Sequence, residues 1–97
     1  MKAIFIIHNQ AYSDEILTIL EQFGQRGFTR WTEVQGRGGS EGIPHLGNHA
    51  WPEQNYAVIS FVPDESVQGI LDALKATDEA TPDLGIRAFC WDIAASV

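Results

Sequence analysis

The amino-acid sequence predicts an α+β domain of the ferredoxin-like class, with the element order βαββαβ. Short runs rich in β-forming residues alternate with runs whose apolar residues recur at helical spacing. This strand–helix–strand pattern occurs twice, and a long loop separates the two halves. Two such halves form an antiparallel sheet with both helices on one face. The chain of 97 residues is expected to be a single domain, residues 1–97.

The first half of the pattern runs from residue 2 to residue 34. Lys2–His8 is a nearly continuous apolar run, which is typical of a strand buried on both faces. Ser13 is the expected N-cap of the first helix, and Gly24 is its expected end. Phe28–Val34 is rich in β-forming residues and alternates in polarity, so it is predicted to be the second strand.

The second half follows a loop that is expected to span residues 36–53. This loop holds five glycines and two prolines, and loops longer than about 12–15 residues are usually functional or disordered. Tyr56–Val62 is predicted to be the third strand, and Pro63–Ser66 is predicted to open the second helix. Thr77–Leu84 is expected to be a polar turn and Gly85–Ile93 the fourth strand.

One face of the predicted sheet has no helix to cover it. Apolar residues occur on both faces of the first strand, and Phe61, Phe89 and Trp91 are large apolar side chains on later strands. A large exposed apolar face is rare in a monomer. The sequence therefore predicts an oligomer in which other subunits cover this face.

The charge and the hydropathy pattern exclude two classes of partner. The net charge is −7, with 13 acidic and 6 scattered basic side chains. Because nucleic-acid binding depends on basic residues that neutralise phosphates, a nucleic-acid partner is not expected. No apolar run approaches the roughly 20 residues of a membrane helix, so the protein is not expected to be membrane-inserted. A cytoplasmic location is predicted, and Cys90, the single cysteine, is expected to be a buried structural thiol.

The segment Gly36-Arg37-Gly38-Gly39 follows the second strand and is a candidate anion site. Its backbone N–H groups could form a nest for an anion, although no helix follows to complete a phosphate loop. A flexible hinge is the alternative interpretation. No nucleophile elbow, Walker loop or dinucleotide fingerprint is present in the sequence, and no carboxylate has a neighbour that would raise its pKa. We therefore do not expect an enzyme.

The long loop also contains candidate metal ligands. Imidazole and carboxylate groups together suit divalent transition metals such as zinc, nickel, cobalt or copper. The candidates are His45, His49, Glu41 and Glu53. His8, at the end of the first strand, could join them. The alternative is that these side chains form hydrogen bonds within the loop or against a neighbouring subunit.

Three segments of the chain resemble the P-II signalling family. Gly24–Gly38 is similar to that family's "G-x-x-G-hydrophobic-T" turn followed by a strand that ends "T-E-V-x-G-x-G". Ala57–Glu65 resembles "I-x-x-V-V-P-D-D", and Arg87–Ile93 resembles "K-I-F-V-F-D-V". The resemblance covers nearly the whole chain apart from the long loop.

The resemblance implies a homotrimer whose sheets pack inward, with effector sites between subunits and a loop that contacts a client protein. P-II proteins bind adenine nucleotides. The residues that correspond to effector contacts are Gly36, Arg37 and Gly38 at the base of the loop, and Arg87 in the place of the family's lysine. The glycine-rich phosphate loop of the family is reduced here to Thr81–Arg87, and the tyrosine that classical members modify has no match.

The loop sequence "H-L-G-N-H-A-W-P-E" looks like that of a divergent P-II-like branch associated with membrane transporters, including metal efflux systems. The expected function is therefore that of a regulatory protein that senses a small effector, either an adenine nucleotide or a divalent transition metal, and signals to a membrane transporter. The alternative is a metal-tolerance protein that buffers metal, as the CutA-type trimers of the same fold imply.

Overall fold

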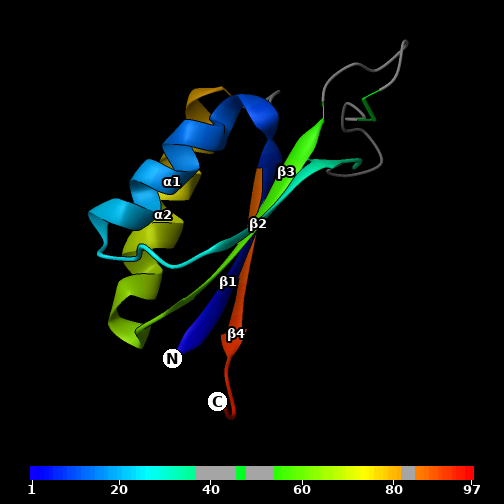
Figure 1. Cartoon of the computed structure of the whole chain (residues 1–97). Helices are drawn as coiled ribbons and strands as arrows, with labels where there is room; N and C mark the ends of the chain where they lie inside the picture. The colour runs from blue at the N-terminus through cyan, green and yellow to red at the C-terminus, as the bar shows by residue number, and fades with distance from the viewer. Residues whose placement is uncertain (37–45, 48–53, 82–84) are drawn as a thin grey trace.

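The computed structural model describes residues 1–36, 46–47, 54–81 and 85–97. The elements follow the predicted order, with one additional short 3₁₀ helix, η1 (Figure 1). They are β1 (Lys2–Asn9), η1 (Gln10–Tyr12), α1 (Ser13–Gln22), β2 (Thr29–Val34), β3 (Asn55–Val62), α2 (Asp64–Ala80) and β4 (Ile86–Asp92).

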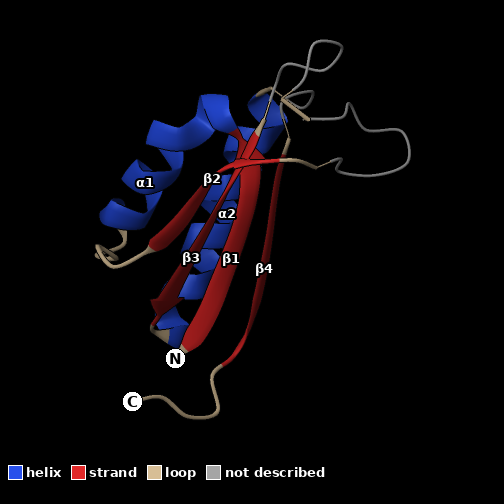
Figure 2. Ribbon diagram, turned by 45° about the vertical axis from the view of Figure 1, so that its right-hand side comes forward, coloured by secondary structure: helices blue, strands red, loops and turns tan. Residues whose placement is uncertain are grey.

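The four strands form one antiparallel sheet in the order β2-β3-β1-β4. Both helices lie on the same side of this sheet, so the molecule has one helical layer and one sheet layer (Figures 1 and 2). The predicted ferredoxin-like α+β fold is confirmed. Strands β1 and β3 form the centre of the sheet, while β2 and β4 are its two edges.

The hydrophobic core lies between the helices and the sheet. Successive side chains of a strand point to opposite faces, and the even-numbered apolar residues Ile4 and Ile6 of β1, Val58 and Val62 of β3, and Ile86 of β4 face the helices. The core contains Ile4 and Ile6 of β1, Val58 and Val62 of β3, Ile86 of β4, and Ile16, Ile19, Leu20, Val67, Ile70 and Leu74 of the helices. Each fully buried side chain of this size stabilises the fold by roughly 1.5–3 kcal/mol.

Three local expectations are wrong. Ser13 is the first residue of α1 and not its cap, because η1 leads directly into the helix; its hydroxyl accepts a hydrogen bond from Arg30 instead. Helix α2 continues through the predicted turn to Ala80. The Thr77 hydroxyl donates to the Ala73 carbonyl one turn earlier, and this bond satisfies a polar side chain within the helix. Cys90 is exposed because it lies on an edge strand.

In the part of the chain that the structure describes, no helix combines the length and the hydropathy that a bilayer-spanning segment requires.

Candidate functional site

The face of the sheet that lies away from the helices is open. The strand registers place Phe5 opposite both Ile59 and Phe89, and Ile7 opposite both Ala57 and Arg87. All of these are odd-numbered residues, so they share the face that no helix covers. Phe5 and Ile7 are only partly buried, so β1 is not buried on both faces within a single chain.

Four large aromatic side chains are about half exposed on or beside this face. The exposed fractions are 47% for Trp31, 51% for Phe61, 49% for Phe89 and 46% for Trp91. The ring of Trp31 packs edge-on against Phe5, with the ring centroids 6.2 Å apart. The guanidinium of Arg87 lies over the ring of Phe89, 5.8 Å from its centroid. The predicted uncovered apolar face is therefore present in the structure.

A β-bulge in β2 shapes one end of the open face. Trp31 pairs with Ala57, but Val34 pairs with Asn55, so β2 contains one residue more than its partner strand between these pairs. Glu33 in the bulge has a φ of 59°, an unusual backbone conformation for a side chain of this size. Because of the extra residue, Trp31 and Val34 share one face although they are three residues apart.

A pocket with a volume of about 300 Å³ lies beside this bulge on the open face. It is lined by Phe5, Ile7, Trp31, Val34, Gln35 and Ala57. Five of these six side chains are apolar, and two of them are aromatic. Gln35 is the polar member, and its Nε2 donates a hydrogen bond to the Leu46 carbonyl at 2.8 Å. Gln35, the first residue after β2, therefore connects the pocket to Leu46 in the segment that joins β2 to β3.

Two of the four predicted effector-binding residues lie next to this pocket. Arg87 is directly opposite Ile7, which lines the pocket. Gly36 follows Gln35, and a Cβ atom on Gly36 would lie 2.7 Å from the Asn55 side-chain nitrogen. The backbone of Gly36 thus runs close against β3. The fold brings Gly36 and Arg87 to the same end of the sheet, whereas Arg37 and Gly38 lie outside the described residues.

Backbone hydrogen bonds hold the loop bases together at this end of the sheet. Asn9 N–H donates to the Gly85 carbonyl at 3.1 Å, and Gln10 N–H donates to the Gln54 carbonyl at 2.9 Å. The end of β1 therefore contacts the segment before β3 and the segment before β4. A change in either loop can be transmitted to the end of β1 through these bonds.

His8 is buried beneath this junction, on the helix side of the sheet. Its Nδ1 is 2.8 Å from the Asn9 carbonyl, and its Nε2 has no hydrogen-bond partner among the described residues. Burial lowers the pKa of His8 below its usual value, and the positive charge of Arg30 lowers it further. The ring also contacts Tyr56 edge-on at 6.1 Å. His8 is therefore a neutral imidazole at pH 7.

The predicted metal site is not tested by the described part of the chain. His45, His49, Glu41 and Glu53 all lie outside it. Within residues 1–36, 46–47, 54–81 and 85–97, no group of three or more His, Cys, Asp or Glu side chains could hold a metal ion. A metal site formed by the four loop residues stays a prediction.

The residues that line the pocket were not predicted as site residues. Phe5 and Ile7 belong to an apolar strand run that gives no sign of a binding role. Trp31 and Val34 meet only because of the bulge, which no residue pattern in β2 indicates. The one available signal was Trp31 itself, a large aromatic residue on a strand otherwise rich in polar and charged side chains.

Residues 1–94 match the family model described as nitrogen regulatory protein P-II. The chain also resembles solved structures of CPII, a nitrogen regulatory PII-like protein from Thiomonas intermedia K12. One is bound to ADP, AMP and bicarbonate; it is 25% identical, has a TM-score of 0.77, and the match covers 95% of this chain and 84% of that chain. Another, bound to ADP and bicarbonate, is 26% identical with a TM-score of 0.78 and the same coverage.

A PII-like signaling protein from Thermus thermophilus is 24% identical with a TM-score of 0.64, over 93% of this chain and 83% of that chain. This likeness supports the fold alone. No match was found among the curated proteins.

Proposed function

Because the chain belongs to the nitrogen regulatory protein P-II family, we propose that it is a regulatory protein that binds an adenine nucleotide beside Gly36 and Arg87. The observation that carries this proposal is the pocket on the open sheet face, which has apolar and aromatic walls and a cation next to it. A nucleotide combines a flat apolar ring with anionic phosphates, so it matches both parts of this site.

The pocket walls suit the base and Arg87 suits a phosphate. The Trp31 and Phe5 rings offer aromatic surface for a flat heterocycle. The guanidinium of Arg87 can form charge-assisted hydrogen bonds with phosphate oxygens. Gly36 has no side chain, which makes room for the Asn55 amide and keeps the end of β2, beside the pocket, close to β3. CPII structures contain ADP and AMP, which supports the same class of effector here.

A second subunit would close this site. The pocket is open in one chain, and a further pocket of about 340 Å³, lined by Gly27, Phe28, Thr29, Ile59 and Phe61, lies on the same side of the molecule. In a homotrimer the two pockets of neighbouring chains could face each other. A heterologous contact that closes after three copies would also cover the half-exposed aromatic residues.

Nucleotide binding would change the conformation of the loop that follows β2. This loop would then signal to a partner protein, most simply a membrane transporter. Gln35 supports this idea because it lines the pocket and also binds the Leu46 carbonyl. A nucleotide that contacts Gln35 would change the restraint on the loop base. The transporter as partner rests on the resemblance of the loop sequence to the transporter-associated branch of the family.

Calorimetric titration of the full chain with ADP, AMP and ATP tests nucleotide binding. We expect Arg87→Ala to weaken binding of the tightest of the three, by about tenfold, which corresponds to one charge-assisted hydrogen bond. Lys75→Met is the control because Lys75 is an exposed cation of α2, on the opposite side of the sheet from this pocket. Equal affinities in the wild type and both variants would refute the phosphate role of Arg87.

Co-purification from solubilised membranes tests the partner. The full chain, carried as bait with and without the nucleotide, should retain a transporter in a nucleotide-dependent manner. Retention of only soluble proteins would contradict a transporter as partner, while the nucleotide proposal would stand on the titration alone.

The alternative function, metal buffering in the manner of CutA-type proteins, draws no support from the described residues. Its candidate ligands all lie in the loop outside them.

A further inference from the structure

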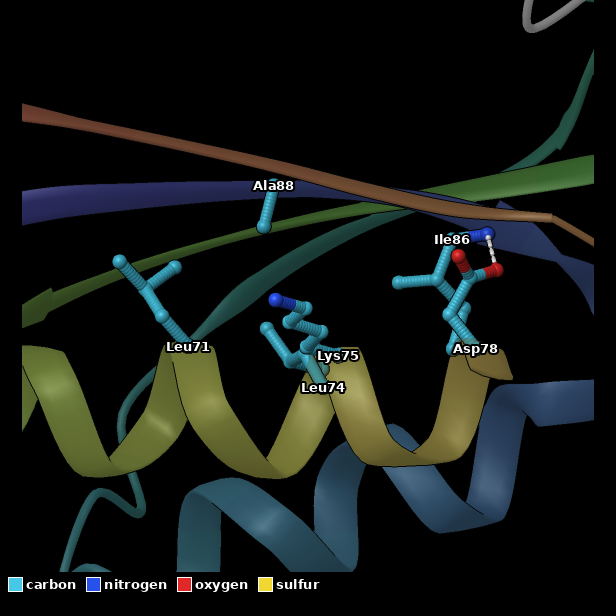
Figure 3. A pocket seen from close by; sticks show the side chains of 6 residues that line it. All are labelled: Leu71, Leu74, Lys75, Asp78, Ile86 and Ala88. Atoms are coloured by element: carbon cyan, nitrogen blue, oxygen red, sulfur yellow. Dashed lines mark hydrogen bonds between the residues drawn. The ribbon is translucent and has the colours of Figure 1, made fainter. Parts of the chain in front are cut away.

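A separate pocket lies on the helical side of the sheet, between α2 and the edge strand β4 (Figure 3). Its volume is about 180 Å³, and it is lined by Leu71, Leu74, Lys75, Asp78, Ile86 and Ala88. Ile86 and Ala88 point toward the helices, whereas Arg87 between them points to the open face. The α2–β4 pocket is therefore on the opposite side of the sheet from the proposed nucleotide site.

The α2–β4 pocket has an apolar floor and two opposite charges at its edge. Leu71, Leu74, Ile86 and Ala88 provide the apolar surface. Lys75 and Asp78 are three residues apart on one helix, a spacing that places their side chains on the same helix face. Figure 3 shows the Lys75 side chain rising from α2 toward β4, between Leu71 and the bond from Ile86 to Asp78.

Asp78 is held in position by the backbone of β4. Its Oδ1 accepts a hydrogen bond from Ile86 N–H at 2.9 Å, which leaves Oδ2 as a hydrogen-bond acceptor at the edge of the pocket. Because one oxygen is fixed, the orientation of the carboxylate is set before any ligand arrives. This reduces the entropy that a ligand must overcome on binding.

Lys75 has no ion-pair partner in the described part of the chain. It is the only basic residue in α1 and α2, which contain several acidic side chains. An ammonium without a partner beside an apolar pocket favours a ligand with a carboxylate and an apolar part. The neighbouring carboxylate of Asp78 favours a ligand that also carries a positive charge.

We propose that the α2–β4 pocket binds a free α-amino acid with a small aliphatic side chain, such as leucine or valine. The carboxylate of the ligand would pair with Lys75, its ammonium with Asp78, and its side chain would cover the apolar floor. The volume of the pocket suits a ligand of this size, because a cavity of about 150 Å³ holds a benzene molecule. A pocket of 180 Å³ has room for such an amino acid and is too small for a nucleotide.

Titration of the full chain with L-leucine and two truncated probes tests the proposal. The probe 4-methylpentanoate lacks the ammonium, and 3-methylbutylamine lacks the carboxylate. Leucine should bind, and each probe should bind about tenfold or more weakly, because each loses one charge-assisted contact. No heat with leucine at about 10 mM, or equal affinity for leucine and either probe, would overturn the proposal.

Two variants locate the binding site. Asp78→Asn removes the charge but keeps an oxygen that can accept from Ile86 N–H, and Lys75→Met removes the charge but keeps an apolar stem. Each should weaken leucine binding by about tenfold. Glu79→Gln is the control, since it removes a charge from α2 outside the pocket.

Leucine affinity equal to that of the wild type in both pocket variants would overturn the assignment. Thermal unfolding followed by circular dichroism establishes that the variants are folded, and an unchanged affinity for nucleotide would show that the two sites are separate.

Discussion

Gly69 of α2 lies directly against the ring of Phe23, the residue that follows α1. A Cβ atom on Gly69 would lie 2.4 Å from Cε1 and 2.9 Å from Cζ of that ring. These distances are far shorter than a van der Waals contact. Gly69 therefore allows the two helices to pack at their present separation.

Gly69→Ala should lower the free energy of unfolding by about 1 kcal/mol. Overpacking typically costs about 1–3 kcal/mol, and the higher helix propensity of alanine offsets about 1 kcal/mol of this. Urea unfolding measures the difference. Gly27→Ala is the matched control, because a Cβ there meets nothing within 4 Å. The cost should shrink in the double variant with Phe23→Leu, whose smaller side chain leaves space; strictly additive effects would contradict a contact between the two residues.

The helical layer shows what the sequence could predict and what it could not. The helical spacing of the apolar residues predicted two helices that each pack one stripe of their surface against the sheet. Ile16, Leu20, Ile70 and Leu74 lie on these buried stripes. The sequence predicted that α2 ends too early, because the polar residues after Leu74 are also typical of a turn. Only their hydrogen bonds show that they belong to the helix. The bond from Thr77 to the Ala73 carbonyl is such a contact, made within the helix itself.

The candidate site was predictable only where it depended on residue type. The resemblance to the P-II family pointed to Gly36 as a glycine at the base of the loop and to Arg87 as a cation in the place of that family's lysine. The pocket between them depends on the register between β2 and β3, and the bulge at Glu33 changes that register by one residue. A shift of one residue reverses the face to which every later side chain points, so regular alternation along β2 would put Val34 on the face opposite to Trp31.

Glu33→Gly should leave the bulge intact, with a free energy of unfolding equal to or above that of the wild type. Glu33 has a φ of 59°, a region that costs most residues about 1–2 kcal/mol and glycine almost nothing. Glu33→Val should be destabilised by more than about 1 kcal/mol, because β-branched residues tolerate this region least. Urea unfolding of the two variants checks the order. Equal stability of the valine and glycine variants would show that the positive φ carries no strain.

Stability should fall with decreasing pH because of His8. Burial lowers the pKa of His8 in the folded state, so the unfolded chain binds a proton at about pH 6.5 and the folded chain does not. The stabilising contribution is therefore complete above about pH 6.5 and decreases as the pH falls toward the lowered pKa of the folded state. Arg30 and Tyr56 are the charged and titratable groups that face His8.

Urea unfolding between pH 7.5 and pH 5 measures this effect. His8→Gln has no titrating group at this position and should show a weaker dependence on pH in the range just below about 6.5. An identical pH profile in the wild type and in His8→Gln would mean that another group is responsible.

A charge on the open sheet face should dissociate the oligomer before it unfolds the domain. Phe61 and Phe89 are about half exposed in one chain, so Phe61→Glu or Phe89→Glu costs little in the isolated fold. In an assembly whose sheets pack together, the same change buries an unpaired charge. Light scattering should give the mass of a monomer for each variant, with the circular dichroism spectrum unchanged.

Ala76→Glu, at an exposed position of α2, should leave the assembly as it is in the wild type. A wild-type chain that is monomeric at micromolar concentration would contradict the predicted homotrimer.

Zinc, nickel and copper titrations separate metal binding from nucleotide binding. If the loop holds a metal site, His45 and His49 are ligands and Glu41 or Glu53 completes the set. The double variant His45→Ala/His49→Ala should then lose metal binding while it keeps the affinity of the wild type for ADP. Metal affinity should also decrease as the pH falls through about 6.5, since a protonated imidazole cannot bind a metal ion.

His8→Gln is the control, because His8 is buried between the sheet and the helices with its Nδ1 at the Asn9 carbonyl. Unchanged metal binding in the double variant would eliminate the loop as the site, and loss of metal binding in His8→Gln would place His8 among the ligands.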